Sequence, residues 1–166
     1  MKLSEYYNII RNKVMIKKVQ GKVYLSDISL ISMNCIGGTF YHDMNCKFLT
    51  PTVNLFFTAS DFIKFVNDLD YYLSFTPVVE MGEKYPIGTL DDIKIFFMHY
   101  DSCEDALQKW EDRKKRVNPQ KIFVIMVEQN GFSKEDFENF KKIKYPKILF
   151  VNNKVYECED SVYFSQ

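Results

Sequence analysis

No two cysteines of this sequence lie close enough together to form a CxxC pair. The four thiols, Cys35, Cys46, Cys103 and Cys158, are widely separated. A zinc knuckle or a redox dithiol needs closer spacing, and disulfides are uncommon in a reducing cytosol. We therefore expect no metal site, and we treat each cysteine as a separate thiol.

The sequence also lacks a long apolar segment and an excess of either charge. Its opening residues, MKLSEYYNIIRNK, are charged and interrupted, unlike a signal peptide, and no later segment approaches the roughly 18 apolar residues that span a bilayer. Lys plus Arg and Asp plus Glu both total 22, so no overall field attracts nucleic acid or an anionic membrane. We expect a cytoplasmic protein with no membrane span and no nucleic-acid partner.

Four common catalytic patterns are absent as well. The sequence contains no GxGxxG, GxxxxGKS or GxxxxGKT, GxSxG or HExxH. Their absence removes the simplest interpretations as a dinucleotide-binding protein, a P-loop NTPase, a serine hydrolase or a zinc protease.

The apolar content predicts one α/β domain over residues 1–166. Of the 166 residues 46% are hydrophobic and 16% aromatic, which is ample for one continuous core. Apolar spacing predicts helices over residues 4–19, 60–73, 102–116 and 133–140, with Ser60, Ser102 and Ser133 as their candidate N-caps after the first. Strands are expected over 27–33, 53–57, 77–81, 93–99, 121–127 and 147–151, and turns over 84–90. The strand–helix–strand order near the C-terminus favours parallel pairing, so we expect a mixed or mostly parallel sheet flanked by helices.

The segment ISMNCIGG places a thiol where a strand is expected to end. Gly37 and Gly38 would form a tight turn whose amides approach the sulfur of Cys35, favour its thiolate and later hold an oxyanion, with Asn34 as a further donor. The alternative is a buried structural cysteine before a turn, since free cysteines are among the most buried residues.

A nucleophilic cysteine usually needs a base, and the chain has two histidines. His99 ends the expected strand over residues 93–99, so in a parallel sheet it could emerge at the same edge as Cys35. His42 is the other candidate. Either could instead be a structural histidine.

A basic cluster follows Trp110 in the expected helix over residues 102–116. Arg113 and Arg116 are the better candidates to clamp a phosphate, as in coenzyme A or a nucleotide sugar. The alternative is a solvated helix end with favourably placed cations.

Several separated motifs resemble one bacterial family in the same order. They are ISMNCIGG, TPTVNLFF, DFIKFVNDLDYYL, YPIGTLDDIKIFFMHY, EDALQKWEDRKKRVN and KIFVIMVEQNGF. The family is that of exopolysaccharide biosynthesis proteins, number nineteen-nineteen among the domains of unknown function. Ile36 stands where the family pattern has tryptophan. The positions that match its motifs are Asn34, Cys35, Gly37, Gly38, Tyr85, Pro86, Gly88, His99, Tyr100, Trp110 and Arg113.

The resemblance implies a role in exopolysaccharide or capsule assembly, as an acyl- or glycosyl-group transferase. In this hypothesis Cys35 is the nucleophile and His99 the base, with Asn34 beside them. Gly37, Gly38, Tyr85, Tyr100, Arg113 and Arg116 bind a carbohydrate or nucleotide-sugar substrate, and an acyl-CoA or nucleotide sugar is the donor. Two alternatives stay open: a cysteine hydrolase with the same dyad, and a non-catalytic glycan- or nucleotide-sugar-binding partner of a polysaccharide-synthesis complex.

Overall fold

The computed structural model describes residues 26–165. The helix that we expect over residues 4–19 lies outside the described residues.

A four-stranded parallel sheet, sheet A, forms the centre of the fold. Its order is β1 (Ser29–Ser32), β5 (Ile122–Val127), β6 (Lys147–Val151) and β7 (Ser161–Tyr163), and each neighbouring pair is parallel. The predicted strand–helix–strand unit is confirmed, with α6 (Lys134–Lys141) between β5 and β6. The α/β class and the mostly parallel sheet are confirmed too, although β7 is too short to give a recognisable sequence pattern.

A second sheet, sheet B, is an antiparallel meander. It consists of β2 (Val78–Met81), β3 (Pro86–Leu90) and β4 (Ile93–Phe96). The expected turns over residues 84–90 are therefore wrong for residues 86–90, which form β3, while residues 84 and 85 do lie in a bend. Pro86 begins β3, where proline is tolerated, and Gly88 leaves room for a neighbouring ring, since a Cβ there would lie 2.8 Å from Cε2 of Phe97. β4 also ends at Phe96, three residues earlier than the expected strand.

The helices begin at side-chain caps that mostly match the sequence. Ser102 caps α5 (Cys103–Lys114), and Ser133 makes a full capping box with Asp136 at the start of α6. The third cap differs, because Thr58 and not Ser60 accepts the Asp61 amide at the start of α3 (Ala59–Asn67). The expected long helix is interrupted at Asp68 and continues as α4 (Leu69–Ser74). A helix that the sequence analysis missed, α2 (Ile36–Asp43), follows β1, and a short 3-10 helix spans Lys154–Tyr156.

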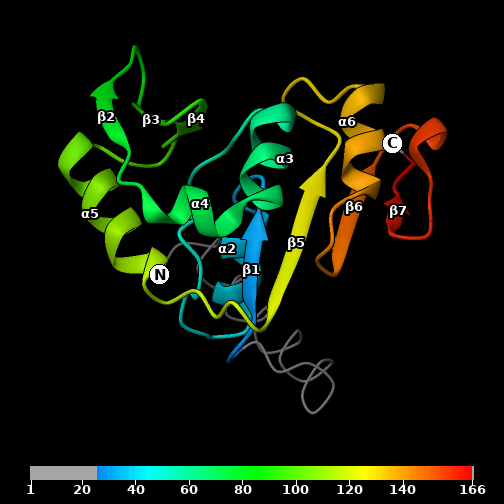
Figure 1. Ribbon diagram of the computed structural model, residues 1–166, viewed down its shortest axis with the longest axis horizontal. Helices are drawn as coiled ribbons and strands as arrows, with labels where there is room; N and C mark the ends of the chain where they lie inside the picture. The colour runs from blue at the N-terminus through cyan, green and yellow to red at the C-terminus, as the bar shows by residue number, and fades with distance from the viewer. Residues whose placement is uncertain (1–25, 166) are drawn as a thin grey trace, which may run out of the picture.

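Helices cover the two faces of sheet A unequally (Figure 1). One face packs on α3 and α6 through a large core that continues to Trp110 of α5 and includes Phe57, Phe65 and Phe140. On the other face α2 lies against β1, where Tyr41 packs with Leu30 and Ile125. In Figure 1 sheet B and α5 stand at the side of β1, next to α4.

Side chains close the outer edge of β1. The Tyr41 hydroxyl accepts a hydrogen bond from the Leu30 amide at 2.9 Å and donates one to the Ile28 carbonyl. Further along, Thr52 Oγ1 accepts from the Ser32 amide at 3.0 Å. These bonds take the place of a neighbouring strand, and they fix α2 and residues 50–53 beside β1.

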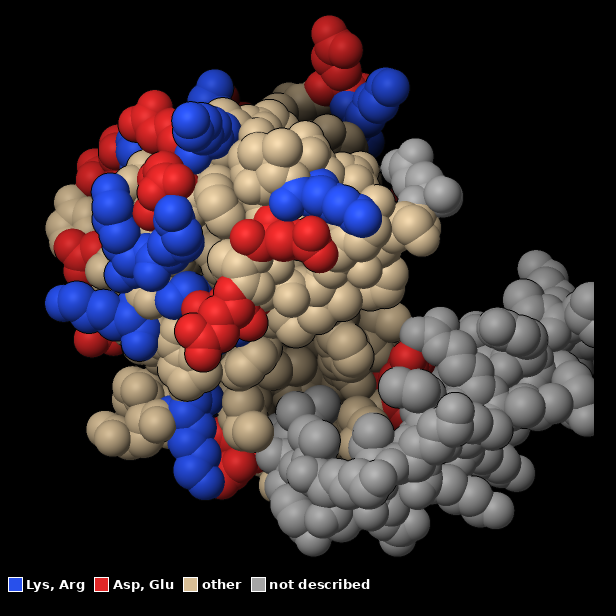
Figure 2. Space-filling model, turned by 90° about the vertical axis from the view of Figure 1, so that its right-hand side faces the viewer, with Lys and Arg blue, Asp and Glu red and all other residues tan. Residues whose placement is uncertain are grey.

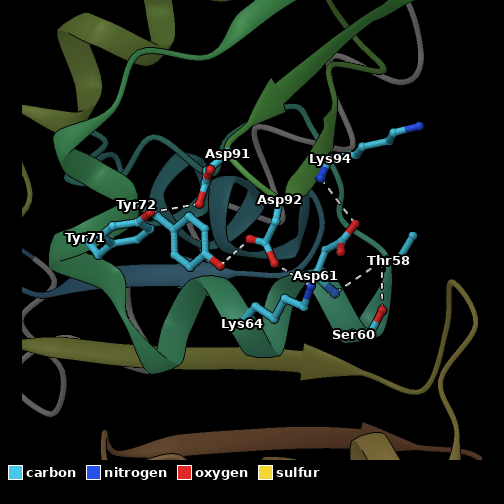
Figure 3. A network of polar contacts seen from close by, with 9 residues as sticks. All are labelled: Thr58, Ser60, Asp61, Lys64, Tyr71, Tyr72, Asp91, Asp92 and Lys94. Atoms are coloured by element: carbon cyan, nitrogen blue, oxygen red, sulfur yellow. Dashed lines mark hydrogen bonds and ion pairs between the residues drawn. The ribbon is translucent and has the colours of Figure 1, made fainter.

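A polar network joins the β3–β4 hairpin to α3 and α4 (Figure 3). Asp92 accepts hydrogen bonds from the Tyr72 hydroxyl and from Lys64 Nζ, both at 2.7 Å, and Asp91 accepts from the Tyr71 hydroxyl at 2.8 Å. Lys64 and then Tyr72 lower the pKa of the Asp92 carboxyl, while burial and the bond to Asp92 raise the pKa of Tyr72. The Asp92 carboxylate therefore ties sheet B to the main body.

We expect Asp92→Asn to weaken the acid dependence of stability. Because the pKa of Asp92 is lower in the folded chain than in the unfolded chain, its contribution is present above the unfolded value of about 3.9 and is lost as the pH falls through the folded value. Urea unfolding between pH 3 and 7 measures this. As the pH is lowered, the free energy of unfolding should fall less in Asp92→Asn and in Lys64→Met than in the unchanged protein. Lys109→Met, an exposed lysine elsewhere, is the control. An unchanged acid slope in Asp92→Asn would contradict this role.

Candidate functional site

A pocket of about 430 Å³ lies where α2 meets the segment that leads from sheet A to sheet B. Its size falls within the range of small-molecule sites. It is lined by Cys35, Gly38, Thr39, His42, Asp43, Phe48, Val53, Asn54 and His99. The pocket thus brings together the thiol and both histidines that the sequence analysis singled out.

α2 and its N-cap supply five of these residues. Cys35 is the N-cap, and Gly38, Thr39, His42 and Asp43 follow three, four, seven and eight positions later, which is the spacing of a single helical face. Asn34 holds the start of the helix, because its Oδ1 accepts the Ile36 amide at 3.1 Å. α2 therefore places the Cys35 thiol and the His42 imidazole at the same pocket.

The two glycines do not form the tight turn that we expect from the sequence. They lie in the first turn of α2, where they let the helix approach β1 and Val53: a Cβ on Gly37 would lie 2.8 Å from the Ser32 Cβ, and one on Gly38 would lie 3.1 Å from the Val53 Cγ1. The Gly37 amide donates to Ser32 Oγ at 3.2 Å, so it is not directed at the sulfur. Gly38 alone of the two lines the pocket, and within the described residues its amide has no hydrogen-bond partner.

The Cys35 thiol is half-buried. Its Sγ lies 3.8 Å from the Leu55 carbonyl oxygen, a long contact in which the thiol is the donor. Burial raises the pKa of Cys35, and the backbone amide of Cys35 offsets this only in part. The expected low-pKa thiolate is therefore not supported, and the group at the pocket is a protonated thiol that needs a base to react.

His99 reaches the pocket by a different route from the one expected. It follows β4 of the antiparallel sheet, so it does not share a parallel-sheet edge with Cys35. Its amide instead donates to the Asn54 carbonyl at 3.3 Å, which fixes it beside the segment that passes Cys35. His42 is 65% exposed at its side chain, and its Nδ1 lies 3.8 Å from Oδ1 of the buried Asp43.

Tyr100 and Arg113 support the pocket wall and do not line the pocket. The Tyr100 hydroxyl is buried, donates to the Val53 carbonyl at 2.7 Å and accepts from Arg113 Nη1 at 2.6 Å. Burial raises the pKa of Tyr100, and the neighbouring Arg113 lowers it in part. The Arg113 guanidinium also lies 5.3 Å from the centre of the Phe48 ring, a cation–π distance. Both side chains thus make contacts within the fold, and their binding of substrate stays a prediction.

Three other predicted residues lie outside the pocket lining. Asn34 uses both ends of its side chain, since its Nδ2 also contacts Gln129 Oε1 at 3.4 Å. Tyr85 packs edge-on against Phe56, with ring centres 6.1 Å apart. Arg116 follows α5 and donates its amide to the Arg113 carbonyl at 3.0 Å.

Sequence reasoning missed Thr39, Phe48 and Asn54 as pocket residues. Thr39 was recoverable from its helical spacing to Cys35, had α2 been recognised. Asn54 carried a weaker signal, as an asparagine between apolar residues is a candidate for the left-handed backbone conformation that it adopts, with φ 62°. Phe48 carried no signal that distinguishes it from a core aromatic.

Residues 26–165 hold no group of three histidine, cysteine or acidic side chains placed to bind a metal. Among the described helices none has the length and apolar character to cross a membrane. Figure 2 shows basic and acidic side chains interspersed on the β7 side of the molecule, where Lys141 pairs with Glu138 at 2.7 Å and Lys147 with Asp160 at 3.3 Å.

Comparisons with known proteins place the sequence in a family without assigning an activity. The family model described as "Domain of unknown function (DUF1919)" matches residues 6–166. An "Uncharacterized protein" of Haemophilus influenzae (strain ATCC 51907 / DSM 11121 / KW20 / Rd) is 31% identical over 150 residues, which cover 89% of this chain and 72% of that protein. The match thus extends over the described fold and its pocket.

We expect Cys35 to react more slowly with iodoacetamide in the folded protein than in the urea-unfolded chain. Burial raises the pKa of Cys35 in the folded protein, so its thiolate fraction at pH 8 is smaller than that of an unfolded thiol with a pKa of about 8.5. Alkylation followed site by site with peptide mass spectrometry from pH 6 to 10 measures this. A folded-state midpoint below that of the unfolded chain would contradict it.

We expect Gly37→Ala to destabilise the fold by about 1 to 3 kcal/mol, the usual cost of overpacking. The new Cβ would lie 2.8 Å from the Ser32 Cβ, and the strand that carries Ser32 cannot move away easily. Gly38→Ala is the matched control, because its nearest neighbour is a valine methyl at 3.1 Å and alanine favours the helix by about 1 kcal/mol over glycine. Urea unfolding should rank Gly37→Ala as clearly the less stable variant, and equal stability would contradict the packing described.

Proposed function

We propose that this chain, which belongs to the DUF1919 family, is an acyl-group transferase that uses Cys35 as its nucleophile and acts in surface-polysaccharide assembly. The observation that carries the proposal is the pocket that Cys35 shares with His99 and His42. A thiol with an imidazole base is a standard pair for covalent acyl transfer. The association with polysaccharide comes from the resemblance of the sequence motifs.

The state of the thiol decides which mechanism fits. Because burial raises the pKa of Cys35, the resting enzyme holds a neutral thiol. A neutral thiol becomes a strong nucleophile when a base removes its proton as the substrate arrives. We assign this role to His99, because its backbone is fixed by the bond to Asn54 and it lines the same pocket as the sulfur. His42, which lines the same pocket and lies 3.8 Å from Asp43, is the alternative base.

The proposed reaction has two steps, acylation of Cys35 and transfer of the acyl group to the acceptor. In the first, the His99 imidazole takes the Cys35 proton, the sulfur attacks the carbonyl carbon of an acyl thioester, and the imidazolium returns the proton to the departing thiol. Cys35 then carries the acyl group as a thioester. In the second step, His99 takes the proton of an acceptor hydroxyl, the hydroxyl oxygen attacks the Cys35 thioester, and the Cys35 thiol leaves with the proton.

We propose an acyl-CoA or another acyl thioester as donor and a carbohydrate hydroxyl as acceptor, in the cytoplasm. Phe48 offers an aromatic surface in the pocket, and the Arg113 guanidinium lies 5.3 Å from the centre of its ring. Aromatic rings with neighbouring polar groups suit the apolar faces and hydroxyl edges of sugar rings. Thr39 is exposed at the pocket, and its hydroxyl, which donates to the Cys35 carbonyl at 3.2 Å, can still accept a hydrogen bond.

Incubation with a panel of short-chain acyl-CoA thioesters tests the first step. We expect intact-mass spectrometry to show one acyl group added, peptide mapping to place it on Cys35, and Cys35→Ala to abolish it. Cys103→Ala is the control, because Cys103 is also partly buried but does not line the pocket. An acyl group that forms equally on Cys35→Ala, or saturable ligand binding without any acylation, would contradict the proposal. Release of free acid that added sugars do not divert would instead identify a hydrolase.

The base is tested by replacing each histidine. We expect His99→Asn to slow acylation of Cys35 by about 10²- to 10⁴-fold, the usual worth of a general base, and His42→Asn to have a smaller effect. Single-turnover acylation measured by stopped quench gives both rates. A larger loss in His42→Asn than in His99→Asn would transfer the role of base to His42.

A further inference from the structure

Asn54 has an unusual backbone for its place in the chain. It is one of four described non-glycine residues with positive φ: Asn45, Asn54, Asp91 and Asn130. Such a conformation is tolerated by asparagine and aspartate but disfavoured for other side chains. Asn54 is flanked by Val53 and Leu55, both at most 1% exposed, so the reversal occurs within a segment that is otherwise extended and buried.

The other three residues have evident structural reasons for this conformation. Asn45 directly follows the end of α2, where a left-handed residue commonly ends a helix. Asp91 forms the β3–β4 turn and accepts the Tyr71 hydroxyl, and Asn130 Nδ2 donates to the Phe57 carbonyl at 3.2 Å. The Asn54 side chain, by contrast, makes no hydrogen bond within residues 26–165 and lines the pocket with Cys35 and His99.

The backbone around Asn54 is held firmly. Its carbonyl accepts the His99 amide at 3.3 Å, the preceding carbonyl of Val53 accepts the Tyr100 hydroxyl at 2.7 Å, and the following carbonyl of Leu55 contacts the Cys35 thiol at 3.8 Å. Asn54 is exposed, lines the same pocket as the nucleophile and the proposed base, and its carboxamide makes no hydrogen bond within residues 26–165. Its N–H groups are therefore available to donate to a reacting group in the pocket.

We propose that the Asn54 carboxamide is a catalytic residue, which donates an N–H to the oxyanion that forms when Cys35 attacks an acyl carbonyl. This inference deepens the proposed acyl transfer and rests on it. When the Cys35–carbon bond forms, the carbonyl π electrons move to oxygen, and the Asn54 Nδ2 hydrogen bond stabilises that negative charge until the C=O bond re-forms and the donor thiol leaves. Asn54 thereby takes the role of side-chain donor first expected of Asn34, whose carboxamide is used within the fold.

Two variants separate the side chain from the backbone. Asn54→Gly retains a residue suited to positive φ but removes the carboxamide, and Asn54→Asp keeps the shape but replaces the donor group with a carboxylate. Asn45→Gly is the matched control, since Asn45 has a similar positive φ of 52° and lies outside the pocket lining. Urea unfolding should find Asn54→Gly and Asn45→Gly folded.

Two reactions of the same thiol form the test. Acylation by acetyl-CoA passes through an oxyanion, whereas alkylation by iodoacetamide does not. We expect Asn54→Gly to slow acylation of Cys35 about 100-fold or more, which is typical of losing an oxyanion donor, with alkylation changed less than about twofold. Asn54→Asp should slow acylation at least as much, and Asn45→Gly should leave both rates unchanged.

Results that contradict the role of Asn54 differ from results that contradict the proposed function. Acylation that proceeds at the normal rate in Asn54→Gly would overturn the role of Asn54 and leave the proposed transferase intact. Equal losses of acylation and alkylation would also overturn it, because they would show a change in the thiol itself. If Cys35 of the unchanged protein accepts no acyl group from any thioester of the panel, both the proposed function and this inference are wrong.

Discussion

Residues 53–57 hold the two sheets together by hydrogen bonds on both sides of the segment. On one side the Phe57 amide donates to the Met33 carbonyl at 3.0 Å, just beyond β1. On the other side Phe56 exchanges two bonds of 2.9 Å with Phe96 of β4, and the Asn54 carbonyl accepts the His99 amide. Because the backbone groups of an extended chain point to alternate edges, five residues suffice to join sheet A to sheet B. The buried side chains of Val53, Leu55 and Phe57 anchor the segment in the core.

The pocket is a consequence of this junction. Cys35 stands at the start of α2, beside the end of β1, and His99 stands just beyond β4; the segment passes between these positions. The same packing that positions the thiol also shields it partly from water, which raises the pKa of Cys35. In the proposed transferase this burial is the reason why the thiol needs a neighbouring base.

The sequence predicts most of sheet A and its helices because the signals there are local. Ser102 and Ser133 are followed by acidic residues at capping distance, and the apolar run of β5 is long. The predictions from the sequence fail where tertiary contacts override local conformational preference. Two adjacent glycines suggest a turn, yet they lie in the first turn of α2, where β1 and Val53 leave no room for a Cβ. Cys35 and His99 do share a pocket, but through an antiparallel sheet and a bridging segment that no pattern in the sequence indicates. Arg113 became a candidate through the basic cluster and Tyr100 through the family resemblance, and the structure places both in the wall behind the pocket.

The proposed mechanism requires that residues 53–57 hold the Cys35 thiol beside the His99 ring. Nuclear magnetic resonance of ¹⁵N-histidine-labelled protein tests this most directly, in a variant that keeps Cys35 as its single cysteine by Cys46→Ser, Cys103→Ser and Cys158→Ser. Methylthiolation of Cys35 changes the surroundings of any ring in contact with the sulfur. We expect the ring-nitrogen signals of His99 to shift when Cys35 is modified and to return when the mixed disulfide is reduced. His99 signals that stay unchanged after complete modification would contradict this arrangement.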